Sequence, residues 1–465
     1  MSSPVSLFGT DGIRGPFGQP PLDRDTLTAL GRELGRALVR GASEEAGGPP
    51  EVLLAGDTRA STPEICSWLA AGLTAAGAKV RYGAVLPTAA VAALTAEGPY
   101  AAGIAVSASH NPAADNGVKL ITAEGFKWPQ EGERELERAI AEDGNASAQE
   151  TLSAPPLSQD EELLPHYRQL LEGSLEQELG SASPQPLRGL SLVLDCAQGA
   201  ASELAGSLFR DLGAEVEVLF ASPDGHNINE ACGSTHPETL QQQVKARGAD
   251  LGFAFDGDAD RALLVDETGE LRDGDAMLYL WATALRRGGG LEPSKIVATT
   301  MSNLGLVRAL AQEGIELVRC EVGDRAVVRT LRQQGLRLGG EQSGHLVDLA
   351  RSTTGDGLLT AMVLAVLVAA QEGSVSQQLS GFRRYPQTLI NVEVGRKPPL
   401  EEIPAVAEAR QQVEESLGDD GRLVLRYSGT EPLARVMIEG PDEATIGSLA
   451  QRLAGVIQDS LGPGR

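Results

Sequence analysis

A serine and three aspartates, far apart in the chain, have residue types and spacings suited to phosphoryl transfer. Ser109 stands in the segment Ser107-Ala108-Ser109-His110-Asn111-Pro112, where an imidazole and an amide follow the hydroxyl and a proline stiffens the turn. Asp256, Asp258 and Asp260 occupy alternate positions of a later segment, and such an oxygen-rich set suits a hard divalent cation such as Mg²⁺. A serine that carries a phosphoryl group beside a bound cation can pass that group on.

Both segments also have simpler interpretations. A serine before Asn-Pro is common in turns, where its hydroxyl bonds only to the backbone. A hydrolase triad is disfavoured, because adjacent Ser109 and His110 cannot easily face each other and no Gly-x-Ser-x-Gly elbow frames the serine. The aspartates could open an EF-hand calcium loop, with Glu267 at its twelfth position. That loop needs a glycine where Arg261 stands, and it needs helical flanks where this sequence is strand-like.

Two further segments could hold a phosphorylated sugar. Gly340-Glu341-Gln342-Ser343-Gly344-His345 offers an acceptor and a hydroxyl close to the backbone, as vicinal sugar hydroxyls require, although such turns often have no function. Arg426-Tyr427-Ser428-Gly429-Thr430-Glu431-Pro432 joins a guanidinium, two hydroxyls and free backbone amides, which together form a nest for a phosphate dianion. Arg435 follows and can reinforce it.

These four segments, together with Phe8-Gly9-Thr10-Asp11-Gly12-Ile13-Arg14-Gly15, resemble the α-D-phosphohexomutase family over nearly the whole chain. The resemblance implies that Ser109 carries the phosphate, and His110 and Asn111 could orient it. It also implies one Mg²⁺ per chain, held by phosphoserine 109, Asp256, Asp258 and Asp260. Lys119 and Arg14 are implied to handle the proton of the reacting hydroxyl. We expect nearby cations to lower the pKa of Lys119, which suits acid–base work, and Arg14 to act electrostatically.

By the same resemblance, the substrate is a phosphosugar, and a bisphosphorylated sugar is both intermediate and activator. Asn227 to Thr235, Gln342 and Tyr385-Pro386-Gln387 look like the glucosamine branch of the family. We therefore expect interconversion of glucosamine 6-phosphate and glucosamine 1-phosphate, for UDP-N-acetylglucosamine and cell-wall synthesis. Mannose and glucose phosphates remain the competing substrates, because selection depends on one substituent at C2. A non-catalytic sugar-phosphate-binding protein is disfavoured by the intact reactive residues. The implied substrate-binding residues are Arg261, Glu341, Ser343, His345, Arg426, Ser428, Gly429, Thr430 and Arg435.

Composition limits the class of protein. The chain has 465 residues, 42% hydrophobic and 4% aromatic, and a formal charge of −25, which argues against binding to nucleic acid or an acidic membrane. The four cysteines have no paired spacing, which indicates neither disulfides nor zinc. The first residues lack the charged start and apolar run of a signal peptide, so none is expected. The longest apolar stretch, Leu358 to Ala370, is too short to cross a bilayer. We expect a cytoplasmic monomer or homodimer.

The elements that must position these residues follow an α/β pattern. A strand over Tyr100 to Val106 delivers Ser109 just beyond its C-terminal end, and a strand over Leu251 to Phe255 ends at Asp256. Asp25 could cap a helix with an apolar stripe at Leu27, Leu30, Leu34 and Leu38. Asp57 with Arg59, and Asp324 with Arg325, are expected to be structural ion pairs at domain contacts.

The resemblance implies three similar α/β domains with mixed sheets around a central cleft, and a smaller C-terminal α+β domain. A segment from Asp143 to Gln159, rich in Ser, Ala, Pro and Gly, is expected to be a linker. The expected domains are residues 1–155 with the phosphoserine loop, 156–262 ending in the metal loop, 263–380 with the sugar loop, and 381–465 with the phosphate loop.

Overall fold

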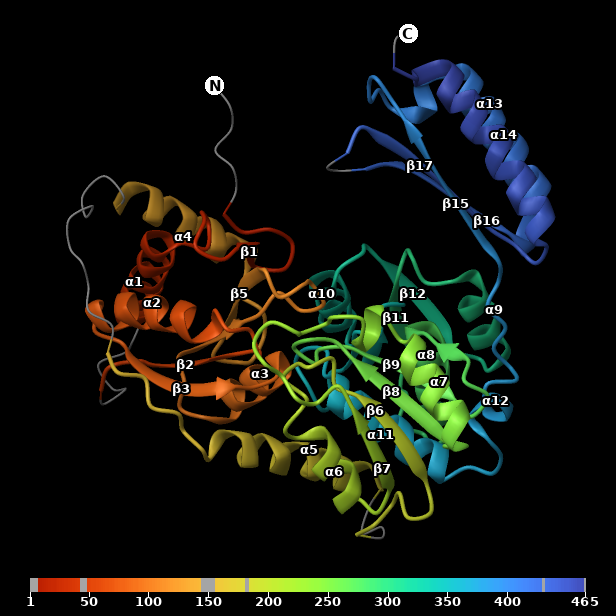
Figure 1. Ribbon diagram of the computed structural model, residues 1–465. Helices are drawn as coiled ribbons and strands as arrows, with labels where there is room; N and C mark the ends of the chain where they lie inside the picture. The colour runs from red at the N-terminus through yellow and green to blue at the C-terminus, as the bar shows by residue number, and fades with distance from the viewer. Residues whose placement is uncertain (1–6, 42–47, 144–154, 180–183, 429–430, 464–465) are drawn as a thin grey trace. The chain divides into compact units, whose positions relative to one another are not determined.

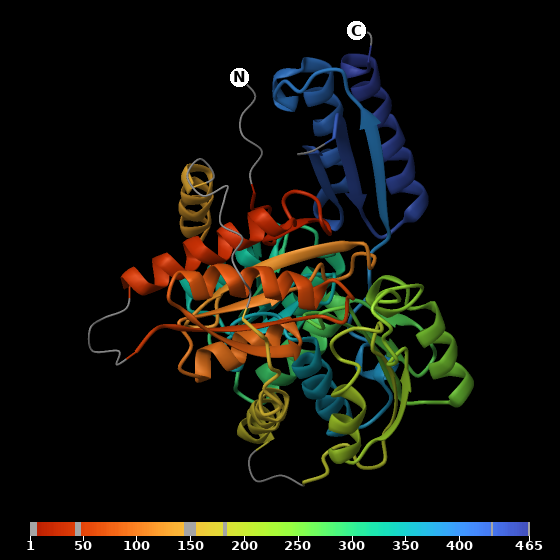
Figure 2. The same ribbon diagram turned by 60° about the vertical axis from the view of Figure 1, so that its left-hand side comes forward.

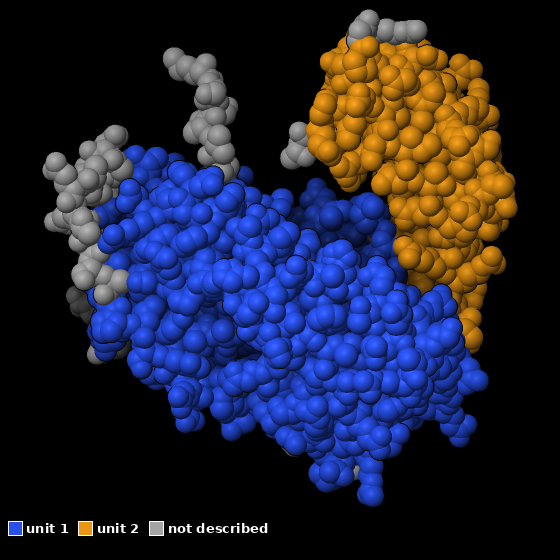
Figure 3. Space-filling model, in the orientation of Figure 1, with its two compact units in different colours: residues 1–301, 317–379 blue, residues 302–316, 380–465 orange. Residues whose placement is uncertain are grey.

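The computed structural model describes residues 7–41, 48–143, 155–179, 184–428 and 431–463. Two compact units divide the chain, one of Met1–Met301 with Leu317–Leu379 and the other of Ser302–Glu316 with Ser380–Arg465 (Figure 3). Three sheets with their helices belong to the first unit, and an antiparallel sheet with two long helices belongs to the second (Figure 1). This confirms the predicted class of three α/β domains and a smaller α+β domain.

The first sheet has the strand order β1-β5-β4-β2-β3, with β4, β2 and β3 parallel and β5 and β1 antiparallel to their neighbours. Helices α1 and α2 cover one face (Figure 1), where Leu27, Leu30 and Leu34 join the buried core. On the other face, Val91 and Thr95 of α3 lie against Gly103. The bounds are β1 Ile13–Pro16, α1 Arg24–Gly41, β2 Glu51–Gly56, α2 Thr62–Ala75, β3 Lys79–Val85, α3 Thr88–Glu97, β4 Ala102–Val106, β5 Asp115–Thr122 and α4 Gln130–Asp143.

Helices α1 and α2 pack closely because glycines face each other at their crossing. A Cβ atom on Gly72 would lie 2.1 Å from the carbonyl oxygen of Thr28, so only glycine permits this approach. The predicted cap of α1 was wrong by two residues. Asp23, not Asp25, accepts the hydrogen bond from the Thr26 amide, at 2.8 Å, because Asp25 already lies within the first turn.

The second sheet repeats the plan of the first, with the strand order β10-β9-β8-β6-β7. Strands β8, β6 and β7 are parallel, while β9 and β10 are antiparallel additions at one edge. The bounds are α5 Leu163–Leu179, β6 Ser191–Asp195, α6 Ala205–Asp211, β7 Glu215–Leu219, η2 Gly233–Thr235, α7 Glu238–Arg247, β8 Leu251–Phe255, β9 Ala262–Asp266 and β10 Leu271–Arg272.

The third sheet has the order β12-β11-β13-β14, with β11 and β13 parallel and β13 and β14 antiparallel. The apolar segment around residue 360 forms the buried helix α11, and no helix of the described residues is long and apolar enough to span a membrane. The bounds are α8 Gly274–Arg287, β11 Lys295–Thr299, β12 Glu316–Cys320, α10 Asp324–Gln334, β13 Leu338–Gly340, β14 Leu346–Asp348, α11 Gly357–Ala369 and α12 Val375–Gln378.

Three candidate functional loops occupy equivalent positions in the three sheets. In each sheet, one central parallel strand leads into a loop and then into an antiparallel neighbour. The loop from β4 to β5 carries Ser109, the loop from β8 to β9 carries the three aspartates, and the loop from β13 to β14 carries Glu341 and Ser343. The same topological position thus holds a candidate functional loop in each of the three sheets, at the carboxyl ends of parallel strands.

The second unit contains the order β15-β17-β16, all antiparallel, packed against two helices. It also includes α9, because Asn303 donates to the Tyr385 carbonyl at 3.0 Å and to Glu439 at 3.1 Å. Figure 2 shows the two long helices on one side of this sheet. The bounds are α9 Leu304–Gln312, β15 Gln387–Glu393, η3 Leu400–Glu402, α13 Pro404–Leu417, η4 Gly418–Asp420, β16 Arg422–Tyr427, β17 Leu433–Glu439 and α14 Glu443–Leu461.

These contacts bear on the domain boundaries drawn from sequence. The boundary after residue 262 falls inside the second sheet, since β9 and β10 extend that sheet to Arg272, and we propose Arg272 as its end. Helix α9 lay within the predicted third domain but clusters with the second unit. Most of the predicted linker, residues 144–154, lies outside the described residues.

Candidate active site

Ser109 and the three aspartates, remote in sequence, meet in the first unit. The Ser109 hydroxyl donates to Asp256 Oδ2 at 2.5 Å, and its side chain is almost completely buried. Ser109 has a φ of 53°, a left-handed conformation that a residue other than glycine adopts at a cost. His110 Nδ1 lies 3.2 Å from Ser109 Oγ. The sequence argument that these adjacent residues cannot face each other was therefore wrong, because the turn brings both side chains to one side.

Buried polar groups fix the backbone of the Ser109 loop. Ser107 Oγ accepts from the Ser109 amide at 2.8 Å and donates to Asp57 at 2.5 Å. Asp57 is paired with Arg59, whose guanidinium donates to the Asn111 carbonyl at 2.7 Å. Asn229, from the second sheet's domain, donates to the carbonyls of Ser109 and Asn111, each at 2.9 Å. The strained turn is thus held by hydrogen bonds from two domains.

The three aspartates form a compact cluster. One carboxylate oxygen from each of Asp256, Asp258 and Asp260 lies within 4.8 Å of the others, and all three residues are buried. Burial and the neighbouring charges of Asp260 and Asp258 raise the pKa of Asp256 well above its usual range. Asp258 Oδ1 is buried and accepts no hydrogen bond from the described residues. Repelling carboxylates with an unsatisfied buried oxygen fit a divalent cation, which would relieve both costs.

Lys119 is the main cation of this cluster. Its Nζ atom donates to Asp258 at 2.7 Å and to Asp260 at 3.1 Å, and it lies 3.5 Å from Asp11. Burial alone would lower the pKa of Lys119, but the three carboxylates outweigh it and hold that pKa well above the usual value. The expected lowering of the pKa was wrong for this arrangement, because the neighbours are anions rather than cations. The same contact keeps the pKa of Asp260 well below its usual range, although burial opposes this.

Arg14 and Arg261 lie at the edge of the cluster. Arg14 donates to Asp11 at 2.5 Å and to the Ser107 carbonyl at 3.1 Å, so it reaches the Ser109 loop from β1. The Arg261 amide donates to Asp256 at 3.1 Å, and its guanidinium lies 3.7 Å from Asp260. Both side chains retain partial exposure, which suits them to meet an incoming anion.

Two helices support the metal loop from outside. At the start of α3, Thr88 Oγ1 donates to Asp258 Oδ2 at 2.6 Å and the Thr88 amide donates to the Asp258 carbonyl at 3.0 Å. At the start of α11, the Gly357 amide donates to the Ala259 carbonyl at 2.9 Å. The first and third α/β domains therefore both position the loop that belongs to the second.

In the sugar loop, Glu341 accepts from the Gly323 amide at 2.9 Å. Ser343 Oγ is buried and has no hydrogen-bond partner among the described residues, so it is free to meet a ligand. His345 is 1% exposed; it accepts from the Gly355 amide at 3.1 Å, and its other ring nitrogen lies 3.7 Å from Asp260. Burial opposes protonation of His345, but Asp260 and Asp324 raise its pKa. In this position His345 contacts the metal loop rather than open space.

Asp324 and Arg325 form ion pairs at a domain contact, as expected, although not with each other. Lys127, after β5, pairs with both Asp11 and Asp324, and Arg325 pairs with Glu133. These contacts join the first and third α/β domains beside the Lys119 cluster.

The predicted phosphate loop lies in the second unit. Arg426 and Arg435 are directly opposite on β16 and β17, so both guanidiniums stand on one face of the hairpin. Arg435 approaches Ser428 Oγ at 3.5 Å and Glu431 at 2.8 Å. Lys397 donates to the Ser428 carbonyl at 2.7 Å and adds a third cation. Gly429 and Thr430 lie outside the described residues.

The sequence analysis did not identify four residues that position the candidate functional loops from outside them. Thr88, Asn229, Lys127 and Lys397 each contact a functional loop from a distant part of the chain. Their local sequences carry no signal of this, apart from Asn229, which lies in a segment noted for its likeness to the glucosamine branch.

Comparison with known proteins identifies the class. Four sequence profiles described as phosphoglucomutase/phosphomannomutase match in order: α/β/α domain I at residues 5–147, domain II at 173–269, domain III at 273–385 and the C-terminal domain at 389–456. A solved structure of a phosphoglucomutase/phosphomannomutase family protein from Burkholderia thailandensis superposes with a TM-score of 0.77 at 27% identity, covering 99% of this chain and 98% of that one. The chain belongs to this family, the α-D-phosphohexomutases, and is a phosphosugar mutase, an isomerase.

Within the family, the chain is similar to bacterial proteins named phosphoglucosamine mutase. One from Solibacter usitatus is 44% identical over 458 residues, which cover 98% of this chain and 99% of that protein. One from Staphylococcus aureus is 42% identical over 458 residues, covering 98% of each. An Aspergillus fumigatus N-acetylphosphoglucosamine mutase, solved with GlcNAc-6P and magnesium, shares the fold with a TM-score of 0.65 at 17% identity, covering 98% and 96%.

Proposed function

We propose that the protein interconverts glucosamine 6-phosphate and glucosamine 1-phosphate through a phosphoserine at position 109. The observation that carries this proposal is the 2.5 Å contact between Ser109 Oγ and Asp256, within the cluster of three aspartates. A buried serine against an aspartate cluster is suited to receiving and releasing a phosphoryl group. The full-length likeness to proteins named phosphoglucosamine mutase supports glucosamine as the sugar.

The proposed reaction balances over two transfers. The phosphoryl group on Ser109 passes to O1 of glucosamine 6-phosphate: the bond from phosphorus to the serine oxygen breaks, a bond from phosphorus to O1 forms, and the proton of O1 is replaced by one gained on the serine oxygen. The bisphosphorylated sugar then reverses its orientation. The bond from phosphorus to O6 breaks, a bond to the Ser109 oxygen forms, the serine hydroxyl loses its proton, and O6 gains one. The same bisphosphate, bound from solution, would phosphorylate an enzyme whose serine is bare, which makes it the activator.

Different residues of this chain have separate roles in these two transfers. Lys119 and Arg14 place positive charge beside the Ser109 loop, where they can stabilise the transferring group. Glu341 and Ser343 offer an acceptor and a donor to sugar hydroxyls. Arg426, Arg435 and Ser428 would hold the phosphate that does not react. Proton transfer by Lys119, and the sugar contacts of His345 and Arg261, stay predictions.

Asp256, Asp258, Asp260 and phosphoserine 109 would hold one Mg²⁺. When bound, that ion supplies charge neutralisation for the phosphoryl group as it moves onto and off the serine oxygen. The buried, unpaired oxygen of Asp258 supports this assignment. A cytoplasmic location is supported by four buried cysteines, all unpaired.

A coupled assay tests the proposal. It compares glucosamine 6-phosphate, mannose 6-phosphate and glucose 6-phosphate as substrates, each in the presence of the corresponding 1,6-bisphosphate as activator. Glucosamine 6-phosphate should give the highest kcat/KM, and mass spectrometry should find the phosphate on the peptide that contains Ser109. A Ser109→Ala variant should lose activity, whereas Ser207→Ala, on the distant helix α6, should keep it. Full activity of Ser109→Ala would refute the mechanism, and preference for another hexose would refute the sugar assignment.

A further inference from the structure

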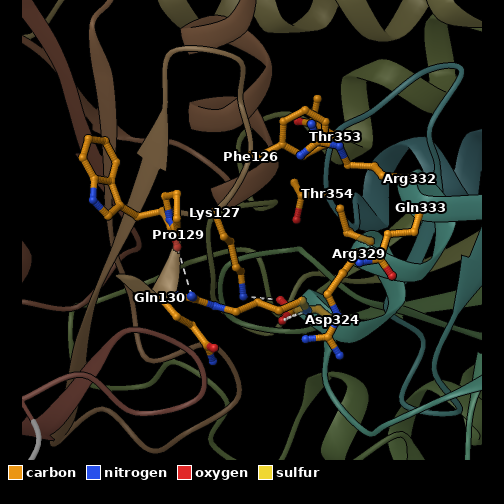
Figure 4. A pocket seen from close by; sticks show the side chains of 13 residues that line it. Phe126, Lys127, Pro129, Gln130, Asp324, Arg329, Arg332, Gln333, Thr353 and Thr354 are labelled. Carbon is orange, nitrogen blue, oxygen red and sulfur yellow. Dashed lines mark hydrogen bonds and ion pairs between the residues drawn. The ribbon is translucent and has the colours of Figure 1, made fainter. Parts of the chain in front are cut away.

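A pocket separate from the aspartate cluster lies between the first and third α/β domains. Figure 4 shows its lining from three segments: residues 126–130 after β5, one face of α10, and the pair Thr353 and Thr354. We call it the α10 pocket. Its volume is about 550 Å³, which lies within the range of small-molecule sites. None of the aspartates of the metal loop, and no residue of the sugar loop, lines it.

The charge of the α10 pocket is opposite in sign to that of the whole chain. Its lining includes Lys127, Arg325, Arg329 and Arg332 but only one carboxylate, Asp324. The chain as a whole carries −25. A concave site of positive charge on an acidic protein attracts anions locally, and guanidinium groups match the oxygens of phosphate.

Two of these cations are already neutralised. Lys127 is held between Asp11 and Asp324, and Figure 4 shows the Lys127–Asp324 contact at the base of the pocket. Arg325 is held by Glu133 and donates to the Trp128 carbonyl at 2.9 Å. These contacts fix the walls, but they leave little charge for a ligand.

The other two cations are available. Among the described residues, Arg329 pairs with exposed Glu321 at 3.2 Å. The two side chains are 54% and 83% accessible, and such exposed pairs contribute little. Arg332 forms no ion pair within 4.0 Å of a described residue, although its charge helps to lower the pKa of exposed Glu124. Its guanidinium lies 4.2 Å from the centre of the Phe126 ring. That stacking holds the guanidinium in place without consuming its hydrogen-bond donors.

We propose that the α10 pocket binds a small phosphorylated molecule whose phosphoryl oxygens contact Arg329 and Arg332. The volume exceeds what a single phosphate fills, and Pro129 and Val328 provide apolar surface for the rest of the ligand. Hexose phosphates and nucleotides share this phosphoryl chemistry. Lys127 lines the pocket and pairs with Asp11, which lies 3.5 Å from Lys119 Nζ. A ligand in the pocket would therefore contact the ion-pair network that surrounds the aspartates.

Isothermal titration calorimetry on the full-length protein tests the proposal with three probes: inorganic pyrophosphate, ADP and glucose 1,6-bisphosphate. The variants are Arg329→Gln with Arg332→Gln, and a control of equal charge change, Arg210→Gln with Arg247→Gln, on exposed parts of α6 and α7. A third variant, Arg426→Gln, reports binding at the phosphate loop. At least one probe should bind the wild type at a site that Arg426→Gln leaves intact, and the α10 pair should weaken binding at that site at least tenfold, while the charge-matched control retains it. Arg426→Gln should weaken only the binding of bisphosphate at the phosphate loop.

The probe that the α10 pocket binds most tightly indicates the chemical class of its ligand. Preference for glucose 1,6-bisphosphate indicates a hexose phosphate, preference for ADP indicates a nucleotide, and equal binding of all three indicates recognition of phosphoryl groups alone. Absence of binding at millimolar probe overturns the proposal, as does unchanged binding by the α10 pair. Equal loss in the charge-matched control, or loss only with Arg426→Gln, also overturns it. The mutase assay above is independent, so the failure of either proposal is recognised separately.

Discussion

Thr88 provides a sharp test of how the metal loop is positioned. Its hydroxyl donates to Asp258 Oδ2 at 2.6 Å, and the only other hydrogen bond to that oxygen among the described residues comes from Lys119 at 2.7 Å. Thr88→Val removes the hydroxyl and keeps the shape of the side chain. Thr88→Ser keeps the hydroxyl and loses a methyl group, so it is the matched control.

The expected magnitude follows from the lost contact. A hydrogen bond to a charged group contributes about 1.5–3 kcal/mol. One decade in an equilibrium constant corresponds to about 1.4 kcal/mol, so the cation affinity should fall by about one to two decades. Partners of metal ligands in other proteins give a similar loss, about 10–100-fold, when they are removed. Lys119 remains in place and should prevent complete loss of the site.

Titration of the unphosphorylated protein with Mn²⁺, followed by electron paramagnetic resonance, measures the affinity without catalysis. Thr88→Val should bind about 10–100-fold more weakly than wild type, and Thr88→Ser within a few-fold. Equal affinity of Thr88→Val and wild type would refute the positioning role. Equal weakening by both variants would assign the effect to packing of α3. Thermal unfolding of both variants verifies that the fold is retained.

Three further predictions follow from other contacts. Lys127→Met should destabilise the protein by about 3–5 kcal/mol in chemical denaturation, because it leaves Asp324 without its cation, and adding Asp324→Asn should recover part of that loss. Burial raises the pKa of Asp356 to about 6, so its stabilising contribution is present below its ordinary pKa and lost as pH rises through 6. Between pH 4 and 7, wild type should therefore lose about 2–3 kcal/mol of unfolding free energy relative to Asp356→Asn; parallel pH profiles would contradict this. Gly274→Ala should raise KM at least tenfold, because its Cβ would lie 2.0 Å from the Glu341 carbonyl, whereas Gly455→Ala, in open space on α14, should leave KM unchanged.

Local patterns predicted the elements well where an apolar run ends at a polar or turn residue. The strand over Leu251–Phe255 matches the structure residue for residue. The boundary predicted at residue 262 falls inside the second sheet, and we propose to move it for a physical reason. Antiparallel edge strands extend a sheet beyond the parallel pattern that marks it in sequence.

The sequence alone was enough to predict which loops carry the chemistry. A cation site, a phosphate nest and a nucleophile turn each need particular residues within a few positions, and such short spacings are visible without a fold. Tertiary structure alone decided the electrostatics of the site. Lys119 meets three carboxylates that raise its pKa, and His345 turns towards Asp260, because separate domains bring these groups into contact. Interactions between charges depend on distances and burial across domains, and those quantities are set by packing rather than by neighbours along the chain.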